Sequence, residues 1–593
     1  MTALVSIQDL WVTARGANGT ETEIVKGVSL EVARGEVLGL IGESGSGKTT
    51  IALATMGYAR YGCRISGGTI RVGEAEITAL GEKALRAIRG RRIAYIAQSA
   101  AASFNPSRTI MAQVIESALI HGTASEAEAR AKAVDLFRAL AIPAPDTIGN
   151  RYPHQVSGGQ LQRLMAAMAL ITDPDVVIFD EPTTALDVTT QIEVLKAFKA
   201  AIRDRTTTGI YVTHDLAVIA QIADRIVVLR NGEVRETGPI DDLLKQPKND
   251  YTRSLLAAAE PAPRLRDEDA KSKEPPLLTV AGLTAGYGGL TDTGEPRIPI
   301  LKDVALTIAR GASLGIIGES GCGKSTLARV IAGLAPQTRG TVVLAGETLP
   351  PALAQRSKDQ LRRIQLVFQS ADTALNPTMS IEEIIGRPLT FYFGLRGEER
   401  RAQVRRMLDL THLPSDVLGR RPGDLSGGQK QRVNLARALA AKPDVLLCDE
   451  VTSALDTVVA AAILDLIVEL RRELGLTTMF ISHDLKTVRA ICDDVLVLYA
   501  GRQVETMGAA AIPETDHHPY TRLLLASVPA LRRGWLEEEA LAAREGKVDL
   551  SLAEGCVFHP RCPDRIAGTC EIGQPPIRTT AAGGVIACHL PAG

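Results

Sequence analysis

The feature that most constrains this chain is an internal duplication. A glycine-rich stretch at residues 42–50, GESGSGKTT, returns at residues 318–326 as GESGCGKST. Three shorter stretches follow the first copy and return in the same order after the second, VSGGQ as LSGGQ, IFDEP as LCDEV and THD as SHD. Each repeat is far longer than one repeat of a solenoid. The sequence therefore predicts two copies of one folding domain.

The composition changes between the copies and again after the second copy. Residues 261–277 are rich in charge and proline, which is typical of a linker between a first domain at 1–260 and a second domain at 278–530. Residues 531–593 have no counterpart in the first copy and hold four of the eight cysteines. We expect these residues to form a Cys-rich C-terminal extension.

The charge and hydropathy of the chain exclude several classes of function. Lys and Arg number 67 against 68 Asp and Glu, so no bulk positive charge is available to hold a nucleic acid. No apolar run approaches the roughly 18–20 residues of a membrane-spanning helix, and no secretory signal is visible. We expect a cytoplasmic protein that binds no nucleic acid. Because aromatics are only 4% of the residues, its core must be aliphatic, as in α/β proteins.

Each glycine-rich stretch lies between an apolar strand and a helix, which is the order that a phosphate-binding P-loop needs. Its glycines leave backbone N–H groups free for phosphate oxygens, and the start of the helix adds its dipole. Lys48 and Lys324 would reach the β- and γ-phosphates, and the hydroxyls of Thr49 and Ser325 would bind Mg²⁺. Two copies in this context make a chance match negligible. The predicted phosphate-binding residues are Gly42, Ser44, Gly45, Ser46, Gly47, Lys48, Thr49, Thr50, Gly318, Ser320, Gly321, Cys322, Gly323, Lys324, Ser325 and Thr326.

Two fully apolar segments, 176–179 and 445–448, have the composition of buried parallel strands. They are followed by the acid pairs Asp180-Glu181 and Asp449-Glu450. The aspartate can hold Mg²⁺ through water, and the glutamate can polarise a water that attacks the γ-phosphate. Alone, such a pair is more often a loop cap. Beside a P-loop, it indicates a catalytic role.

A serine, two glycines and a glutamine precede a helical pattern of apolar residues in each copy. In the first copy, Leu161, Leu164 and Met165 recur at the spacing of one helix face, so Ser157 is predicted to cap that helix. Taken alone, the pattern indicates only a capped helix whose apolar face belongs to the core.

In this order, the P-loop, the Ser-Gly-Gly-Gln signature, the acid pair and the later histidine resemble the ATP-binding-cassette (ABC) ATPases. The resemblance covers roughly residues 4–260 and 277–530. It implies an α/β fold with tandem P-loop NTPase domains, each made of a RecA-like core and a helical subdomain. It also implies that the two domains pair head to tail, so that each ATP, with Mg²⁺, lies between the P-loop of one copy and the signature of the other.

The resemblance assigns residues to two ATP sites. The first site would combine Lys48, Thr49, Gln98, Asp180, Glu181 and His214 with Ser426, Gly427, Gly428, Gln429 and Asp456. The second site would combine Lys324, Ser325, Gln369, Asp449, Glu450 and His483 with Ser157, Gly158, Gly159, Gln160 and Asp187. Both glutamates and both histidines are expected to act in catalysis, and Gln98 and Gln369 to sense Mg²⁺ and couple to a membrane partner. A lone histidine after a strand is more often structural. The aromatic residue on which adenine stacks aligns with Tyr287 in the second copy but with Ala14 in the first.

The segments HPYTRLL at 518–524 and GCVFHPRCP at 555–563 resemble the peptide/nickel/opine import ATPases, and within them the fused double ATPases of oligopeptide, dipeptide or glutathione permeases. The implied function is ATP hydrolysis that drives import of peptides or related small solutes. The implied partners are two transmembrane permease subunits and an extracytoplasmic solute-binding protein, with this chain peripheral on the cytoplasmic face of the inner membrane. The alternative is a soluble cassette protein that acts on ribosomes or DNA. A short linker without a basic helical arm and the lack of a large zinc-bearing insertion favour the transporter.

The four cysteines of the predicted extension are Cys556, Cys562, Cys570 and Cys588. A proline-rich segment with four thiols indicates one metal centre. The family resemblance implies a [4Fe–4S] cluster, with Zn²⁺ as the alternative and free or redox-active thiols as a third possibility. The remaining four cysteines are interpreted as small buried or loop residues.

Overall fold

The computed structural model describes residues 3–16, 19–184, 186–203, 207–262, 275–292, 294–453, 455–513, 516–538, 555–580 and 583–591. The chain forms two compact units. Unit 1 consists of Met1–Ala259, Asp456–Val458 and Pro529–Ala540, and unit 2 consists of Glu260–Leu455, Val459–Val528 and Leu541–Gly593. Most of the predicted linker, at 263–274, and residues 539–554 of the predicted extension lie outside the described residues.

Unit 1 contains a mainly parallel sheet with the strand order β10-β9-β3-β8-β7-β6, in which only β10 is antiparallel to its neighbour. Its central strands are buried along their whole length, as expected for a parallel sheet with both faces covered. A second, antiparallel sheet has the order β2-β1-β4-β5. The strands are β1 (Ala3–Arg15), β2 (Glu21–Ala33), β3 (Val37–Gly42), β4 (Cys63–Val72), β5 (Ala75–Glu76), β6 (Ile93–Ile96), β7 (Val176–Asp180), β8 (Thr208–Val212), β9 (Arg225–Arg230) and β10 (Glu233–Pro239).

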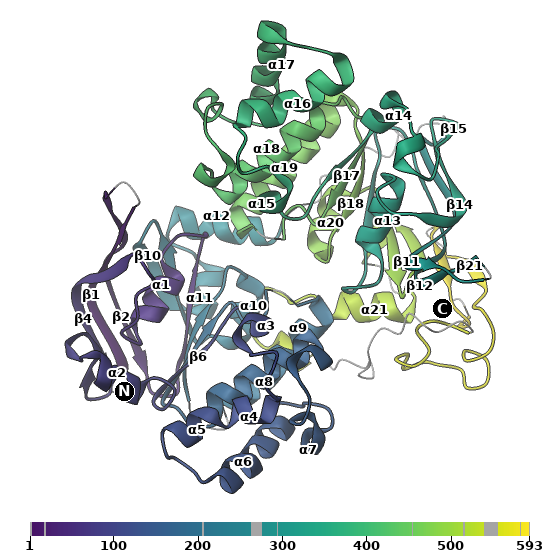
Figure 1. Cartoon of the computed structure of the whole chain (residues 1–593). Coiled ribbons are helices and arrows are strands. Elements are labelled where there is room, and N and C mark those ends of the chain that lie inside the picture. The colour runs from purple at the N-terminus through teal and green to yellow at the C-terminus, as the bar shows by residue number, and fades with distance from the viewer. Residues whose placement is uncertain are drawn as a thin grey trace. The chain divides into compact units, whose positions relative to one another are not determined.

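The chain between β6 and β7 forms the helices α3 to α8, of which α4 to α8 gather on one side of unit 1 (Figure 1). This group is the helical subdomain that the family resemblance implies. The helices of unit 1 are α1 (Lys48–Ala54), α2 (Glu82–Ile88), α3 (Ala100–Ser103), α4 (Ile110–Val114), α5 (Glu116–Ile120), α6 (Glu126–Ala139), α7 (Pro145–Ile148), α8 (Gly158–Leu170), α9 (Val188–Arg203), α10 (Leu216–Ile222), α11 (Ile240–Lys245), α12 (Asp250–Ala259) and α22 (Trp535–Glu538).

Unit 2 repeats this plan and extends its main sheet. The order is β16-β17-β18-β13-β19-β20-β22-β21, parallel as far as β19 and antiparallel beyond it. The antiparallel sheet has the order β12-β11-β14-β15. The strands are β11 (Leu278–Leu290), β12 (Pro296–Ile308), β13 (Ser313–Ile317), β14 (Gln337–Leu344), β15 (Glu347–Thr348), β16 (Ile364–Val367), β17 (Val445–Asp449), β18 (Thr477–Ile481), β19 (Asp494–Tyr499), β20 (Arg502–Gly508), β21 (Ile577–Thr579) and β22 (Val585–Ala587).

The described residues of the predicted extension, 555–580 and 583–591, are called the tail below. They do not confirm a separate Cys-rich extension, because β21 and β22 continue the main sheet of unit 2. β22 pairs with β20 through Glu505↔Ile586 and Thr506↔Val585. The helices of unit 2 are α13 (Lys324–Ile331), α14 (Lys358–Arg363), α15 (Ala371–Ala374), α16 (Ile381–Phe393), α17 (Gly397–Leu410), α18 (Gly427–Leu439), α19 (Thr457–Leu474), α20 (Leu485–Ile491) and α21 (Pro519–Ala526).

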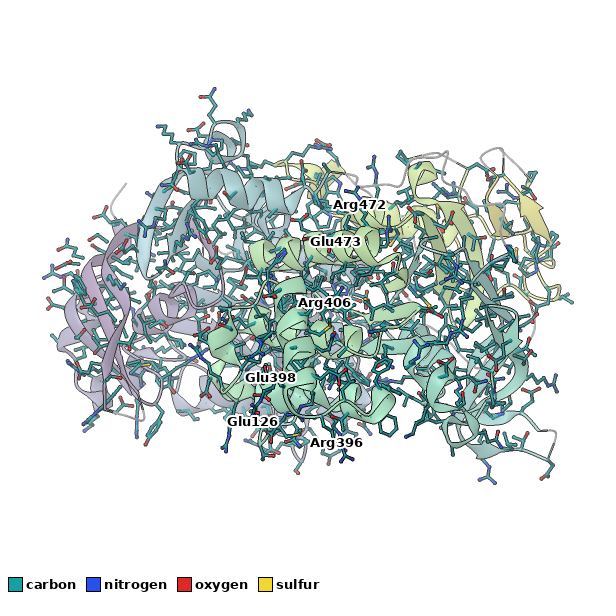
Figure 2. The ribbon with its side chains drawn as sticks, turned by 90° about the horizontal axis from the view of Figure 1, so that it is seen from above. Glu126, Arg396, Glu398, Arg406, Arg472 and Glu473 are labelled. Atoms are coloured by element: carbon teal, nitrogen blue, oxygen red, sulfur yellow. The ribbon has the colours of Figure 1, made fainter. Side chains whose placement is uncertain are left out.

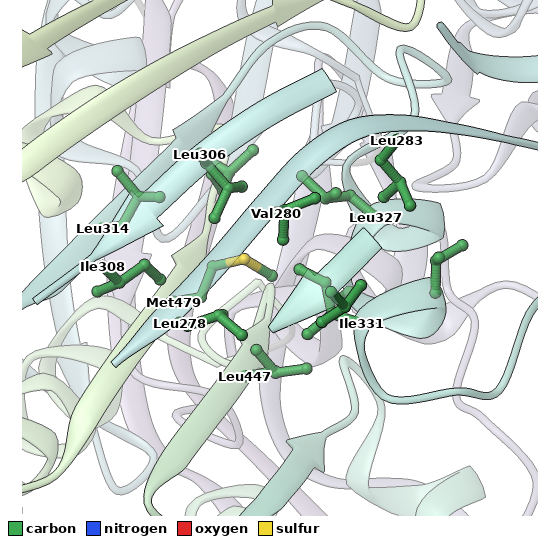
Figure 3. Packing of buried hydrophobic residues seen from close by; sticks show 14 of the residues in the cluster. Leu278, Val280, Leu283, Leu306, Ile308, Leu314, Leu327, Ile331, Leu447 and Met479 are labelled. Atoms are coloured by element: carbon green, nitrogen blue, oxygen red, sulfur yellow. The ribbon is translucent and has the colours of Figure 1, made fainter. Parts of the chain in front are cut away.

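The core of unit 2 joins its two sheets (Figure 3). Leu278 and Val280 of the antiparallel sheet pack in one cluster with Leu447 and Met479 of the parallel sheet and with Leu327 of α13. All five are at most 1% exposed. Burial of a side chain of this size stabilises the fold by about 1.5–3 kcal/mol. Because α13 follows the P-loop, this packing also fixes the start of that helix.

Helix α17, which lies between β16 and β17 of unit 2 in the sequence, is amphipathic. In α17, Val404 and Met407 are buried, whereas Glu398 and Arg406 are exposed (Figure 2). None of the helices in the described ranges is both long and apolar enough to span a membrane.

Candidate functional site

The P-loop of unit 1 is the turn between β3 and α1, and its conformation requires glycine. Gly42, Gly45 and Gly47 have φ angles of 151°, 79° and 96°, in the left-handed region that favours glycine. A Cβ atom at Gly42 would lie 2.1 Å from the carbonyl oxygen of Leu229. The hydroxyl oxygen of Ser46 is buried and has no hydrogen-bond partner within the described residues. An open backbone with a buried free hydroxyl fits a bound phosphate group.

The P-loop lysines point back into their loops. Lys48 Nζ donates to the carbonyl oxygens of Gly42 and Glu43, each at 2.8 Å. In unit 2, Lys324 Nζ donates to Gly318 O at 2.8 Å and to Glu319 O at 3.0 Å. Burial lowers the pKa of Lys48, and the charge of Glu181 opposes that shift. Each ammonium group therefore already lies inside its loop, beside the place that a phosphate would occupy.

The hydroxyl after each lysine pairs with the aspartate at the end of a parallel strand. Thr49 Oγ1 donates to Asp180 Oδ1 at 2.7 Å, and Ser325 Oγ donates to Asp449 Oδ1 at 2.8 Å. Hydroxyl and carboxylate oxygens are ligands that Mg²⁺ accepts. The residues present therefore fit a magnesium ion. Burial raises the pKa of Asp449.

Tyr95 is a site residue that sequence reasoning missed. Its hydroxyl donates to Asp180 Oδ2 at 2.7 Å, so Asp180 is held on both carboxylate oxygens. Tyr95 lies on β6 next to β7, where it faces Ile178 in register. The corresponding strand of unit 2, β16, has the sequence IQLV and offers no tyrosine. No motif in the sequence indicates this contact, because it depends on which strands are neighbours.

The predicted catalytic glutamates have an unusual backbone conformation. Glu181 and Glu450 have φ angles of 47° and 48°. Residues with a side chain rarely adopt this left-handed conformation, because it costs about 1–2 kcal/mol. Gln98 Nε2 donates to Glu181 Oε2 at 3.1 Å, and Gln369 Nε2 donates to Glu450 Oε2 at 2.8 Å. Strain at the same position in both units is typical of a functional residue.

Each glutamate also faces the predicted histidine. His214 Nδ1 lies 3.1 Å from Glu181 Oε1, and His483 Nδ1 lies 3.7 Å from Glu450 Oε1. Burial by itself would raise the pKa of Glu181, but the hydrogen bond and charge of His214 outweigh it and hold that pKa below its usual value. The pKa of Glu450 is lowered in the same way by His483. Both glutamates are therefore ionised at neutral pH.

His214 should titrate above its ordinary pKa of 6.5. Burial alone would lower the pKa of His214 and Lys48 acts in the same direction, but Glu181 and Asp215 outweigh them and raise it. The contribution of protonated His214 to the stability of the folded state is fully present below pH 6.5 and is lost as the pH rises through the raised pKa of His214. The contribution of ionised Glu181 to the stability of the folded state is fully present above the usual pKa of glutamate and is lost as the pH falls through the lowered pKa of Glu181.

The pH titration of histidine ¹³Cε1 chemical shifts measures this pair. One histidine should titrate with a raised midpoint, which should be absent in His214→Gln and lower in Glu181→Gln. A midpoint unchanged by Glu181→Gln would contradict the pair.

The signature serines cap helices as the sequence predicts. Gln160 N donates to Ser157 Oγ at 3.3 Å, and Ser157 N donates back to Gln160 Oε1 at 3.1 Å. Ser426 and Gln429 form the same capping box at the start of α18. A Cβ atom at Gly159 would approach Thr190 of α9 to 2.1 Å, so this glycine permits close helix packing. The capping boxes do not use the N–H groups of Gly158 and Gly159, or of Gly427 and Gly428, so these are the groups left for an anion.

The remaining predicted site residues lie at the edges of these motifs. Asp187 Oδ1 accepts from Thr189 Oγ1 at 2.8 Å and from Thr190 N at 3.0 Å, which caps α9. Asp456 directly precedes α19. Tyr287 is 40% exposed on β11, and its hydroxyl lies 3.4 Å from Thr326 Oγ1. An exposed ring beside the P-loop helix fits the predicted stacking role.

The four tail cysteines give no support to the predicted iron–sulfur or zinc centre. Each is 7% exposed, and burial raises the pKa of Cys556 and of Cys562 to about 11. Across the described ranges, no group of three or more His, Cys, Asp or Glu is placed to hold a metal ion. Of the other four cysteines, Cys322, Cys448 and Cys492 are buried and Cys63 is half-buried, as predicted.

The family model described as ABC transporter matches residues 25–184 and 301–453, which together make up more than half of the chain. This chain therefore belongs to the ABC transporter family, and it carries two ABC ATPase domains of the P-loop NTPase fold. A second model, described as oligopeptide/dipeptide transporter, C-terminal region, matches residues 235–283 and 504–570. ATPase activity is expected of such a chain.

Two curated relatives are similar over almost their whole length. The glutathione import ATP-binding protein GsiA of Salmonella choleraesuis (strain SC-B67) is 36% identical over 547 residues, which cover 86% of this chain and 87% of that protein. GsiA of Escherichia coli (strain K12) is 36% identical over 545 residues, covering 85% and 86%. The solved structure of cbiO1 from Clostridium perfringens, part of the ABC transporter complex cbiONQ, is 28% identical with a TM-score of 0.36 and covers 40% of this chain and 91% of that chain.

Proposed function

We propose that this chain is the ATP-hydrolysing subunit of an importer for peptides or related small solutes. One observation carries the proposal: relatives named as glutathione import ATP-binding proteins match both ATPase domains at 36% identity. Glutathione is a tripeptide, and the second family model concerns oligopeptide and dipeptide transporters. Short peptides are therefore the proposed class of solute. The alternative of a soluble cassette protein that acts on ribosomes or DNA finds no support in these comparisons.

We assign the same roles to the corresponding residues of both domains. The loop N–H groups and Lys48 or Lys324 hold the phosphates of ATP, while Thr49 with Asp180, or Ser325 with Asp449, would bind Mg²⁺. When bound there, Mg²⁺ would supply charge neutralisation for the transferring phosphoryl group. Glu181 or Glu450 accepts the proton of the attacking water. The amide of Gln98 or Gln369 orients that carboxylate, and the histidine keeps it ionised.

The signature segments and the partners complete the proposal. We propose that domains 1–260 and 278–530 pair head to tail, so that Ser157 to Gln160 with Asp187, and Ser426 to Gln429 with Asp456, each contact the ATP of the other domain. The oriented N–H groups of a capped helix suit that role. Two permease subunits would hold the chain on the cytoplasmic face of the inner membrane, and an extracytoplasmic binding protein would deliver the solute.

Purification from membranes tests this proposal. The tagged chain should be recovered with two transmembrane subunits, because ATP hydrolysis drives import only through such partners. In liposomes that contain the complex, a loaded binding protein should stimulate ATP hydrolysis, with reduced glutathione and a tripeptide as the two probes. The empty binding protein is the control. Recovery with ribosomes or DNA, and no transmembrane subunit, would contradict the proposal.

The iron–sulfur centre remains a prediction, and no step of the proposed mechanism passes through it. Iron and acid-labile sulfide analysis of anaerobically purified protein tests it directly. A colourless protein that contains zinc would favour the alternative metal. A metal-free protein with four reactive thiols would favour the third interpretation.

A further inference from the structure

A buried ion pair joins the tail of unit 2 to the P-loop of the same unit. The guanidinium of Arg561 donates to both carboxylate oxygens of Glu319, at 2.6 and 3.0 Å. The two side chains are only 9% and 6% exposed. Glu319 is the second residue of the P-loop sequence GESGCGKST. A bidentate pair fixes the orientation of the carboxylate as well as its distance.

Glu319 is also held through its backbone. Its N–H donates to the hydroxyl oxygen of Tyr520 at 2.7 Å, and its carbonyl oxygen accepts from Lys324 Nζ at 3.0 Å. The residue that the tail holds is therefore one of the two whose carbonyl oxygens accept from the P-loop lysine. A displacement of Glu319 would move the partner of the ammonium group that we assign to the phosphates of ATP.

The tail segment that carries Arg561 is itself firmly attached to unit 2. The ring of Phe558 lies 5.2 Å from that of Tyr499 and 5.4 Å from that of Tyr520, measured between centroids. The N–H of Cys556 donates to the carbonyl oxygen of Cys570 at 2.8 Å, which closes the loop around Arg561. These contacts give Arg561 a fixed place from which to hold the P-loop.

The P-loop of unit 1 has only part of this support. The N–H of Glu43 donates to the hydroxyl oxygen of Tyr251 at 3.1 Å, as in unit 2. In the described part of the chain, however, no arginine forms an ion pair with Glu43, and the guanidinium of Arg230 lies over the Tyr251 ring at 4.6 Å. The tail has no counterpart in the first copy. Two P-loops of nearly identical sequence therefore differ in what holds them.

We propose that Arg561 is a positioning residue for the P-loop of unit 2, and that through it the Cys-rich tail sets the affinity of this loop for MgATP. The proposal rests on the ATP site that we assign to the loop. Loss of Arg561 removes the bidentate partner of a buried carboxylate, and loss of the Glu319 charge removes the bidentate acceptor of a buried guanidinium. In Arg561→Met the loop would then rearrange to bring the Glu319 carboxylate into water, and one of the two carbonyl oxygens that hold Lys324 would move with it. The tail thus makes the two nucleotide sites unequal.

Titration of the full chain with MgATP tests this proposal. A Lys48→Ala background confines tight binding to the P-loop of unit 2. In that background, Arg561→Met and Glu319→Gln should each raise the Kd by roughly 10-fold or more. The double variant should bind no more weakly than the worse single variant, because both changes remove the same interaction. Tyr520→Phe keeps the ion pair and should raise the Kd by a smaller factor, about 3-fold to 10-fold.

Two further variants separate positioning from general loosening of the tail. Asp564→Asn breaks an exposed ion pair with Arg522 that also joins the tail to α21, and it should change the Kd less than twofold. Arg561→Lys keeps the charge and should recover part of the affinity that Arg561→Met loses. The proposal is overturned if Glu319→Gln binds within twofold of the parent, if the two losses add, or if Asp564→Asn weakens binding as much as Arg561→Met. Failure of the Lys48→Ala parent to bind MgATP would instead remove the ATP-site assignment, and the inference with it.

Discussion

Replacement of Glu181 and Glu450 by glutamine should lower kcat for ATP hydrolysis by about 10²-fold to 10⁴-fold and leave MgATP binding intact. Glutamine has the size of glutamate and can still accept the hydrogen bond from Gln98 or Gln369, but it cannot take a proton from water. The lowered pKa of both glutamates means that the wild-type residues are ionised and ready to act as bases at neutral pH. Phosphate release at saturating ATP and an MgATP titration measure the two effects separately.

A glutamate outside the site is the matched control for this experiment. Glu76 on β5 forms an ion pair with Arg71 at 3.0 Å and is 37% exposed, so Glu76→Gln should not change kcat. The single variants Glu181→Gln and Glu450→Gln show how each domain contributes. A double variant that hydrolyses ATP within threefold of the wild-type rate would remove both glutamates from the catalytic role.

Replacement of either P-loop lysine by alanine should weaken MgATP binding at its own loop by roughly 10-fold to 100-fold. Lys48 and Lys324 are 6% exposed, and each already donates to two loop carbonyl oxygens. Each side chain is therefore fixed near the phosphates before ATP binds. Their loss removes the charge-assisted hydrogen bonds that each ammonium group would make to the phosphates. Calorimetric titration of Lys48→Ala, Lys324→Ala and the double variant gives the affinity of each loop.

Thermal unfolding provides an independent measurement of the same loss. A bound ligand stabilises the folded state by RT ln(1 + [L]/Kd), so MgATP should raise the Tm of the double lysine variant clearly less than that of the wild type. Lys83 lies exposed on α2. Lys83→Ala is the control and should keep both the affinity and the rise in Tm. An undiminished rise in the double lysine variant would contradict the P-loop assignment.

The local parts of each site could be predicted from the sequence because they depend on residues that are close along the chain. The helix after the P-loop begins at Lys48, and the apolar segment before Asp180 forms β7. The capping boxes that begin at Ser157 and Ser426 each span four residues. The preference of glycine for left-handed φ, the capping of a helix and the composition of a buried strand all act over such distances.

The contacts that could not be predicted join residues that are distant in the sequence. The hydrogen bond of Tyr95 to Asp180 exists because β6 and β7 are neighbours in the sheet. The left-handed conformation of Glu181 arises where β7 ends, and its sequence gives no glycine to mark it. The predicted metal centre at the tail cysteines was inferred from composition and resemblance, and the structure does not support it.

The sequence by itself determined the duplication, the nucleotide-binding motifs and the family, because each of these is carried by short stretches whose chemistry is complete within a few residues. Only the tertiary structure decided what surrounds those stretches. It placed Tyr95 against Asp180, gave each glutamate its histidine and glutamine partners, and brought Arg561 to Glu319. The reason is physical: strand order and core packing set which distant side chains share a buried space, and in that space an ion pair or hydrogen bond has the strength to position a loop.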